Sequence, residues 1–306
     1  MNGRLAALLL AAMLLLALPG AASRALPAAA APAVVPGAGA PPPGAPGDTV
    51  IHFPDDAFEA AVRMLTGKPQ GDILAGDVAG ITELNLFALN IGDLTGIGHF
   101  TALRMLDCGA TNIEELDVSR NTQLTYLDCS ITGLTSLNVS GCPLLKELIC
   151  NENELTTLDV SRNPALETLE LYQNELTLLD VSGNPALKSL YCHNNQLTEL
   201  DVSQNPKLVN LYCGGNQLTE LDVSRNPELA DLDCADNQLT SLDVSRNPEL
   251  GDLYCDWNLL TALDLRQNPA LNVLSCQNNF FPDRTAILGL DEDRLEAFFF
   301  EPQNAQ

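Results

Sequence analysis

Apolar residues recur along most of the chain with a period of 21 residues. In the unit that begins at Leu187 they occupy positions 1, 4, 6, 11, 14 and 16, and the unit that begins at Leu208 repeats the pattern. Ten such units are present, and they begin at Ile81, Leu103, Leu124, Leu145, Leu166, Leu187, Leu208, Leu229, Leu250 and Leu271. A unit of this length cannot bury its apolar side chains alone, so the pattern predicts a solenoid in which successive units stack.

Each unit predicts one short β-strand followed by a return segment. Buried positions 4 and 6 alternate with exposed positions 3, 5 and 7, which is the spacing of a strand with one buried face. Positions 11, 14 and 16, for example Leu197, Leu200 and Val202, fill the core from the return segment. Because parallel strands stack at ~4.8 Å, we predict an α/β repeat solenoid with a parallel sheet on its concave side. We call the surface formed by positions 3, 5 and 7 the concave face.

The motif L-x-x-L-x-C-x-x-N-x-L is the leucine-rich repeat signature, in which cysteine replaces the third leucine. Asparagine fills position 9 in seven units, and its amide is expected to satisfy backbone groups at the bend. Asn195, Asn216 and Asn237 are therefore assigned structural roles. The Asn-Pro pairs later in each unit predict the outer turn, and the aspartate of each Leu-Asp-Val-Ser turn is expected to cap local N–H groups.

The first 48 residues have a different composition. Residues 1–23 contain a basic start at Arg4, an uncharged run over 5–18 and small residues, which is the layout of a secretory signal peptide. Residues 24–48 are rich in Ala, Pro and Gly and predict a flexible linker. The apolar run is short for a ~20-residue membrane span, although an uncleaved N-terminal anchor stays open. We expect an exported protein that is secreted, at the cell surface or in the periplasm, without further membrane insertion.

Eight of the nine cysteines stand at position 6, which leucine occupies in two other units. A position that accepts leucine or cysteine is a packing position, so Cys192, Cys213 and Cys234 are predicted to be reduced core residues. Disulfides are the alternative, but stacked units hold Cβ atoms wider apart than the ~3.8 Å that a disulfide prefers. No Cys/His spacing typical of zinc occurs, and we predict no metal and no cofactor. Cys142 stands outside this series, and its state is open.

The chain is strongly acidic, with 40 acidic against 15 basic residues and a formal net charge of −25. Such a surface repels phosphate backbones and anionic lipids, so we expect no nucleic-acid partner and no membrane-surface partner. Positions 3, 5 and 7 contain nine acidic residues and all five tyrosines, but no lysine or arginine. The concave face therefore predicts a basic partner.

The cysteine ladder, with its refrain Leu-Thr-x-Leu-Asp-Val-Ser-x-Asn-Pro, resembles bacterial cysteine-ladder leucine-rich repeat proteins of the internalin J type over about residues 50–290. Phe53 to Phe58 opens a predicted helix that Gly67 ends, and this segment is similar to the helical N-terminal cap of internalins. The resemblance implies a right-handed superhelix that binds host or surface macromolecules.

We expect three parts after the linker: a helical N-terminal cap over 49–80, about ten repeats over 81–281 and a C-terminal cap over 282–306. The run from Phe298 to Phe300 is expected to cover the last open repeat, since terminal repeats need a cap for solubility. The immunoglobulin-like modules and wall-sorting signal of listerial family members do not occur in this sequence. Adhesion to host cells is therefore left open.

Candidate binding residues are the aromatic and acidic side chains of the concave face and its rim. The aromatic residues of three successive units are expected to form one patch, because exposed tyrosines are good binding anchors. The complete set is Tyr126, Tyr172, Tyr191, His193, Tyr212, Asp231, Asp233, Asp252, Tyr254, Asp256 and Trp257. Its four aspartates offer oxygen ligands for calcium, but they project from a sheet, and a solvated acidic face is favoured. For Trp257, core packing and ligand contact are both open.

The sequence contains no hydrolase, zinc-protease, phosphate-loop or dinucleotide motif, so we predict that the protein is not an enzyme and assign no catalytic residues. We expect a monomeric module that binds another protein through the concave face, as an adhesin or adaptor. Glycan binding and a purely structural role in the cell envelope are the alternatives.

Overall fold

The computed structural model describes residues 46–304. The predicted signal peptide over 1–23 and residues 24–45 of the predicted linker lie outside the described residues. Among residues 46–304, none of the helices has the length and apolar character needed to cross a membrane.

Three short helices open the described chain, namely the 3-10 helix η2 (Pro46–Asp48) and the α-helices α2 (Asp56–Thr66) and α3 (Ala75–Val78). Helix α2 begins where the Asp55 carboxylate accepts hydrogen bonds from two N–H groups of the first turn, at 2.9 and 2.8 Å. It ends at Gly67, whose φ of 66° suits glycine. The helix predicted between Phe53 and Gly67 is therefore present.

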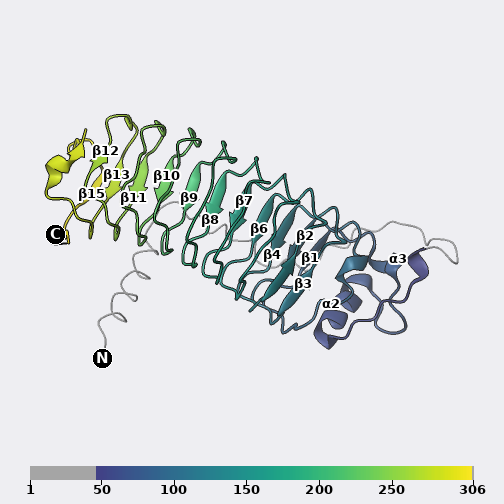
Figure 1. Cartoon of the computed structure of the whole chain (residues 1–306). Helices are drawn as coiled ribbons and strands as arrows, with labels where there is room; N and C mark the ends of the chain where they lie inside the picture. Colours follow the sequence, from purple (N-terminus) through teal and green to yellow (C-terminus); the bar gives the residue numbers. More distant parts are fainter. Residues whose placement is uncertain (1–45, 305–306) are drawn as a thin grey trace, which may run out of the picture. The chain divides into compact units, whose positions relative to one another are not determined.

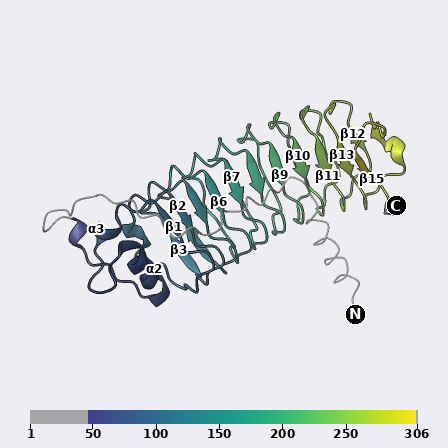
Figure 2. The same ribbon diagram turned by 180° about the vertical axis from the view of Figure 1, so that it is seen from behind.

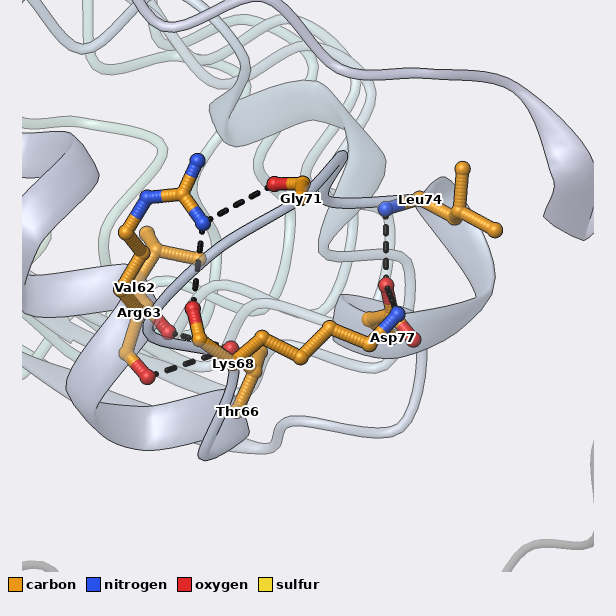
Figure 3. Close-up of polar contacts among 7 residues, drawn as sticks. All are labelled: Val62, Arg63, Thr66, Lys68, Gly71, Leu74 and Asp77. Carbon is orange, nitrogen blue, oxygen red and sulfur yellow. Dashed lines mark hydrogen bonds and ion pairs between the residues drawn. The ribbon is translucent and has the colours of Figure 1, made fainter.

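Polar contacts connect the end of α2 to α3 (Figure 3). Arg63 donates from Nη1 to the carbonyl oxygens of Lys68 and Gly71, at 3.1 and 3.0 Å. The Lys68 ammonium lies 2.5 Å from the Asp77 carboxylate, which also accepts the Leu74 N–H at 2.8 Å. These contacts hold the loop between the two helices in place.

The apolar face of α2 packs against the first repeat. Phe58 and Val62 are fully buried, and the Phe58 ring centroid lies 5.2 Å from that of Phe53 and 6.2 Å from that of Phe100 in the first repeat. The Asp55 carboxylate also accepts the Gly92 N–H of this repeat at 2.8 Å. Helix α2 and the first repeat therefore share one hydrophobic core.

The repeats form a parallel-sheet solenoid of about ten turns, whose strands follow one another in chain order in both views (Figures 1 and 2). The main sheet has eleven strands: β1 (Glu83–Asn85), β2 (Met105–Asp107), β4 (Tyr126–Asp128), β6 (Glu147–Ile149), β7 (Thr168–Glu170), β8 (Ser189–Tyr191), β9 (Asn210–Tyr212), β10 (Asp231–Asp233), β11 (Asp252–Tyr254), β13 (Val273–Ser275) and β15 (Ala297–Phe299). Every neighbouring pair is parallel, and Leu211, for example, pairs with Leu190 on one side and Leu232 on the other. Equivalent positions of successive repeats therefore form straight columns across the sheet.

The return segments contain little regular structure. Two short parallel pairs lie outside the main sheet, β3 (Glu115–Asp117) with β5 (Ser136–Asn138) and β12 (Leu263–Asp264) with β14 (Ile287–Leu288), the last strand coming after the repeats. Two 3-10 helices complete the described elements, η3 (Ile97–His99) and η4 (Arg284–Ala286).

The C-terminal segment lies against the last repeat by extending the sheet. Strand β15 pairs in parallel with β13 and becomes the eleventh strand, one more than the ten that the repeats predict. Phe300 is buried and its ring lies 6.0 Å from Phe281, whereas Phe299 is 48% exposed.

The solenoid core is built from the predicted positions. The leucines at positions 1, 4 and 11 are buried throughout the central repeats, and all nine cysteines are buried and free. Burial raises the pKa of the ladder thiols, to about 12 for Cys192. The ladder therefore acts as apolar packing, and its thiols stay protonated.

Candidate binding surface

The columns of the sheet bring the predicted binding residues onto one surface. Positions 3 and 5 lie on the strands and position 7 lies two residues beyond the strand end, so their side chains point away from the core. Tyr191 pairs in register with Tyr212, and Asp233 pairs with Tyr212 on one side and Tyr254 on the other. Tyr126 lies on β4, three strands away from Tyr191 in the sheet order.

The central aromatic residues form one stacked and one tilted ring pair on β8, β9 and the turns that follow β7 and β8. The rings of Tyr172 and His193 lie 4.6 Å apart and nearly parallel, with an angle of 9° between their planes. Those of Tyr191 and Tyr212 lie 5.0 Å apart, tilted by 32°. Burial lowers the pKa of His193 to about 4, so its imidazole is neutral at pH 7. The structure thus provides an uncharged aromatic platform in the middle of the sheet.

Four carboxylates lie beside this platform, three on β10 and β11 and the fourth, Asp256, just after β11. Asp231 and Asp252 face each other across neighbouring strands, and each affects the pKa of the other. Burial raises the pKa of both groups, and in Asp231 the charge of Asp252 adds to the effect. Burial also raises the pKa of Asp233, to about 6, and that of Asp256. These groups are crowded together without a cation between them.

Two of these four aspartates also order the local backbone. The Asp233 carboxylate accepts the Ala235 N–H at 3.0 Å. The Asp256 carboxylate accepts Ser275 Oγ at 2.7 Å and the Gln277 N–H at 2.8 Å. Within residues 46–304, no salt bridge involves a carboxylate of the concave face, and no group of three or more His, Cys, Asp or Glu side chains is arranged to hold a metal ion.

A second acidic cluster lies toward the N-terminal end of the sheet and is absent from the predicted set. Asp107 is only 3% exposed and its pKa is raised to about 6, chiefly by burial and also by the charge of Asp128. Burial likewise raises the pKa of Glu170, with contributions from Asp128 and Glu147. The sequence shows that these residues are acidic, but it does not show that they are buried, because their burial depends on the side chains of neighbouring repeats.

The rim of the concave face contains exposed apolar residues, of which only Trp257 belongs to the predicted set. Every residue at position 8, from Ala88 to Asn278, has a positive φ between 52° and 64°. Two of them are large and apolar, Ile131 at 51% exposed and Trp257 at 58% exposed. Trp257 therefore does not pack in the core. A usable signal is present in the sequence, since small or polar residues fill this position in the other repeats.

Two columns of buried asparagines support the surface from below. At position 9, Asn216 donates from Nδ2 to the carbonyl oxygens of Cys192 and Cys213, at 3.1 and 3.0 Å, while its Oδ1 accepts the Leu197 N–H at 2.9 Å. The second column consists of the asparagines of the Asn-Pro turns, which the sequence predicted only as turn residues. Asn226, for example, is fully buried and donates to carbonyl groups of the preceding repeat.

Cys142 belongs to this second asparagine column. It is fully buried, and its thiol lies 3.2 Å from the Val118 carbonyl oxygen. Burial raises its pKa to about 12. The ninth cysteine is therefore a free core residue like the other eight.

Exposed aspartates hold the turns of the return segments. Asp201 accepts the Ser203 N–H at 2.8 Å, and the equivalent bond recurs in the neighbouring repeats at 2.9 Å. In Asp201 this backbone hydrogen bond is the largest influence on the pKa and lowers it. The column has the geometry of a local cap rather than of an open binding stripe.

Comparisons with known proteins agree with this architecture. The family described as Leucine Rich repeats (2 copies) matches residues 185–226. Among solved structures, the chain is similar to the functional domain of InlJ from Listeria monocytogenes, which includes a cysteine ladder. The two are 35% identical, the match covers 81% of this chain and 60% of that one, and the TM-score is 0.67. No curated protein matches the chain significantly in sequence.

Two further structures share the fold alone. A leucine-rich repeat protein of Leptospira interrogans is 24% identical, with 66% of this chain and 62% of that chain covered and a TM-score of 0.57. The leucine-rich repeat domain of APL1 is 22% identical, with 75% and 64% covered and a TM-score of 0.64. The chain thus spans about three fifths of the length of each of these structures.

Proposed function

The chain is a cysteine-ladder leucine-rich repeat protein similar to InlJ, and we propose that it binds another protein through its concave face, as an exported adhesin or adaptor. The observation that carries this proposal is the composition of one rigid surface. Two aromatic pairs, one stacked and one tilted, lie on it next to carboxylates that have no cationic partner within the described chain.

Each part of this surface suits recognition of a protein. Tyrosine buries a large area on binding at a small cost in conformational entropy, and the sheet holds the rings in place before the partner arrives. Crowded carboxylates attract a basic partner and increase the association rate at low salt. The aromatic pairs thus provide contact area, and the acidic residues select the charge of the partner.

The remaining features of the chain are consistent with a binding module. Helix α2 completes the core of the first repeat and β15 covers the edge of the last one, so both ends are proposed to act as caps. The N-terminal sequence supports export. The function proposed here requires neither catalysis nor a cofactor, and the solenoid acts as a monomer.

Glycan binding is the second candidate, and one feature favours it. Position 3 beside the tyrosines contains Thr168, Ser189 and Asn210, and Asn210 donates to Ser189 Oγ at 2.9 Å. Hydroxyl and amide groups next to aromatic rings suit a sugar as well as a peptide. A neutral polysaccharide would bind here with little dependence on salt.

A pull-down from envelope and host-cell extracts tests the proposal. The wild type is compared with the double variant Tyr191→Ala/Tyr212→Ala and with the control Gln217→Ala/Gln238→Ala, which changes two exposed residues outside the concave face. Circular dichroism establishes that each protein is folded. We expect one protein to be captured by the wild type and the control, lost in the tyrosine variant and released by raised salt.

Other outcomes contradict the proposal in different ways. Equal capture by all three proteins would place the binding site elsewhere on the molecule. Salt-insensitive binding of a neutral polysaccharide, with no protein captured, would favour the glycan candidate. The absence of any saturable ligand would favour a structural role in the envelope.

A further inference from the structure

One strip of the concave face alternates aromatic and acidic side chains. At position 5, Tyr212 on β9, Asp233 on β10 and Tyr254 on β11 are neighbours in register. Two strand spacings of ~4.8 Å separate the tyrosines, so their Cα atoms lie about 9.6 Å apart with the carboxylate between them. An aromatic residue therefore stands on each side of a negative charge.

Further carboxylates surround the same point. Asp231 and Asp252 occupy position 3 of the same two repeats, and Asp256 occupies position 7. Burial raises the pKa of both tyrosine hydroxyls, and the charges of Asp231 and Asp233 raise it further. The carboxylates therefore lie within electrostatic range of both rings.

We propose that this strip receives one arginine side chain of the protein partner, between the two tyrosines and against the Asp233 carboxylate. We call it the cation subsite, and it consists of Tyr212, Asp231, Asp233, Asp252, Tyr254 and Asp256. The inference rests on the proposed function, and it identifies the group of the partner that the acidic end of the concave face recognises.

The chemistry of the strip matches a guanidinium better than other cations. A planar guanidinium stacks on aromatic faces and presents five donors to several carboxylates at once. Asp231 and Asp252 are neighbours in register on β10 and β11, and the oxygens of ionised carboxylates accept from several guanidinium donors at once. A lysine ammonium is more strongly hydrated and has only three donors, so it would gain less from the rings.

Binding of a cation at the subsite is coupled to the release of protons from its aspartates. The titratable groups that face it are Asp231 and Asp233 on β10, Asp252 and Tyr254 on β11, Asp256 after β11, Tyr212 on β9 and Glu296 before β15. Burial raises the pKa of all four aspartates and so holds protons on them to a higher pH than usual, whereas a bound cation favours their ionised forms. Binding of arginine is therefore accompanied by proton release near pH 6.

The test uses the short peptide acetyl-Gly-Arg-Gly-amide and its lysine and citrulline counterparts as probes of the intact protein. Trp257, the only tryptophan, is 58% exposed and directly follows Asp256, so its fluorescence reports occupation. We expect saturable binding of the arginine peptide, weaker binding of the lysine peptide and none of citrulline. Calorimetry in two buffers of different ionisation enthalpy is expected to show proton release at pH 6.

Two variants and one control locate the effect. Asp233→Asn and Tyr254→Ala are each expected to lower the affinity for the arginine peptide about tenfold, which is the effect of losing one charge-assisted contact. Glu220→Gln, which changes an exposed carboxylate outside the concave face in the same repeat as Tyr212, is expected to leave the affinity unchanged. Circular dichroism and unfolding curves establish that the variants are folded.

Several results would overturn the assignment. The first is that the arginine peptide shows no saturable binding to the folded wild type. The second is that the citrulline or the lysine peptide binds as tightly as the arginine peptide. The third is that Asp233→Asn leaves the affinity for the arginine peptide unchanged. The pull-down separates the two proposals. A partner that is lost with Tyr191→Ala/Tyr212→Ala but retained by Asp233→Asn and Tyr254→Ala would refute only the subsite. Peptide binding without any captured protein would refute only the proposed function.

Discussion

At the scale of single residues, the concave face contains a carboxylate that is almost completely withdrawn from water. Asp107 is 3% exposed, its carboxylate accepts the Gly109 N–H at 3.2 Å, and Asp128 lies opposite it on the next strand. Burial raises its pKa from 3.8 to about 6. A folded-state pKa above the unfolded value means that the group contributes most to stability at low pH, and that this contribution is lost as the pH rises through about 6.

Asp107→Asn is therefore expected to stabilise the protein at neutral pH. Asparagine keeps an acceptor for Gly109 but removes the buried charge, which should add about 1–3 kcal/mol to the free energy of unfolding at pH 7.5. Below about pH 3 wild type and variant should be equally stable, because Asp107 is then mostly protonated in both the folded and the unfolded state. Urea unfolding at pH 3 and pH 7.5 measures the difference.

The exposed Asp236→Asn is the matched control and should show no pH-dependent gain. A variant at Asp107 that is no more stable than the wild type at pH 7.5 would contradict the account of this residue.

At the scale of elements, the solenoid depends on hydrogen bonds between repeats that are not part of any sheet. Asn216 satisfies carbonyl groups of two successive repeats and also accepts the Leu197 N–H. Asn226, in the second column, donates to two carbonyl groups and accepts no hydrogen bond from the described residues. The two columns thus have the same amide but unequal numbers of partners.

Asn216→Ala is expected to destabilise the protein more than Asn226→Ala does. The first substitution leaves a buried N–H and buried carbonyl groups unpaired, which costs about 2–4 kcal/mol, whereas the second leaves only carbonyl groups unpaired. Urea unfolding of both variants checks the order, with the exposed Gln217→Ala as a control near the wild-type value. Equal stability of Asn216→Ala and Gln217→Ala would show that the column does not hold the repeats together.

At the scale of the whole molecule, stability is the sum of repeats and of the contacts between neighbours. The register shows no offset from one strand to the next, so one repeat can be removed without changing the geometry of the others. Removal of residues 208–228 joins position 21 of one unit to position 1 of the next.

The deletion of 208–228 is expected to leave a folded, somewhat less stable solenoid in which β8 pairs with β10. It also removes Tyr212 and with it the ring pair with Tyr191, so capture of the partner should weaken while the fold is kept. Tyr191 then becomes the in-register neighbour of Asp233, so binding of the arginine peptide should be retained. Circular dichroism and the pull-down measure the two effects. Deletion of 208–218 shifts the register and should abolish folding, whereas a folded product of that deletion would contradict the repeat model.

The sequence by itself determined the repeating part of the protein. The period, the strand at positions 3 to 5, the buried leucine and cysteine columns and the inward asparagines follow from spacing alone, because each repeat meets the same neighbours as the one before. The candidate surface could be located for the same reason, since positions 3, 5 and 7 of every unit face away from the core.

Only the tertiary structure decided what does not repeat. Whether Asp107 is buried, whether Trp257 is exposed, how Tyr172 stacks on His193 and how β15 extends the sheet all depend on which side chains stand in the adjacent repeats. The second asparagine column also needed the structure, because a turn motif does not reveal that its amide spans two repeats. These contacts join residues about 20 positions apart, and their free energies depend on distance and burial, which a linear pattern does not contain.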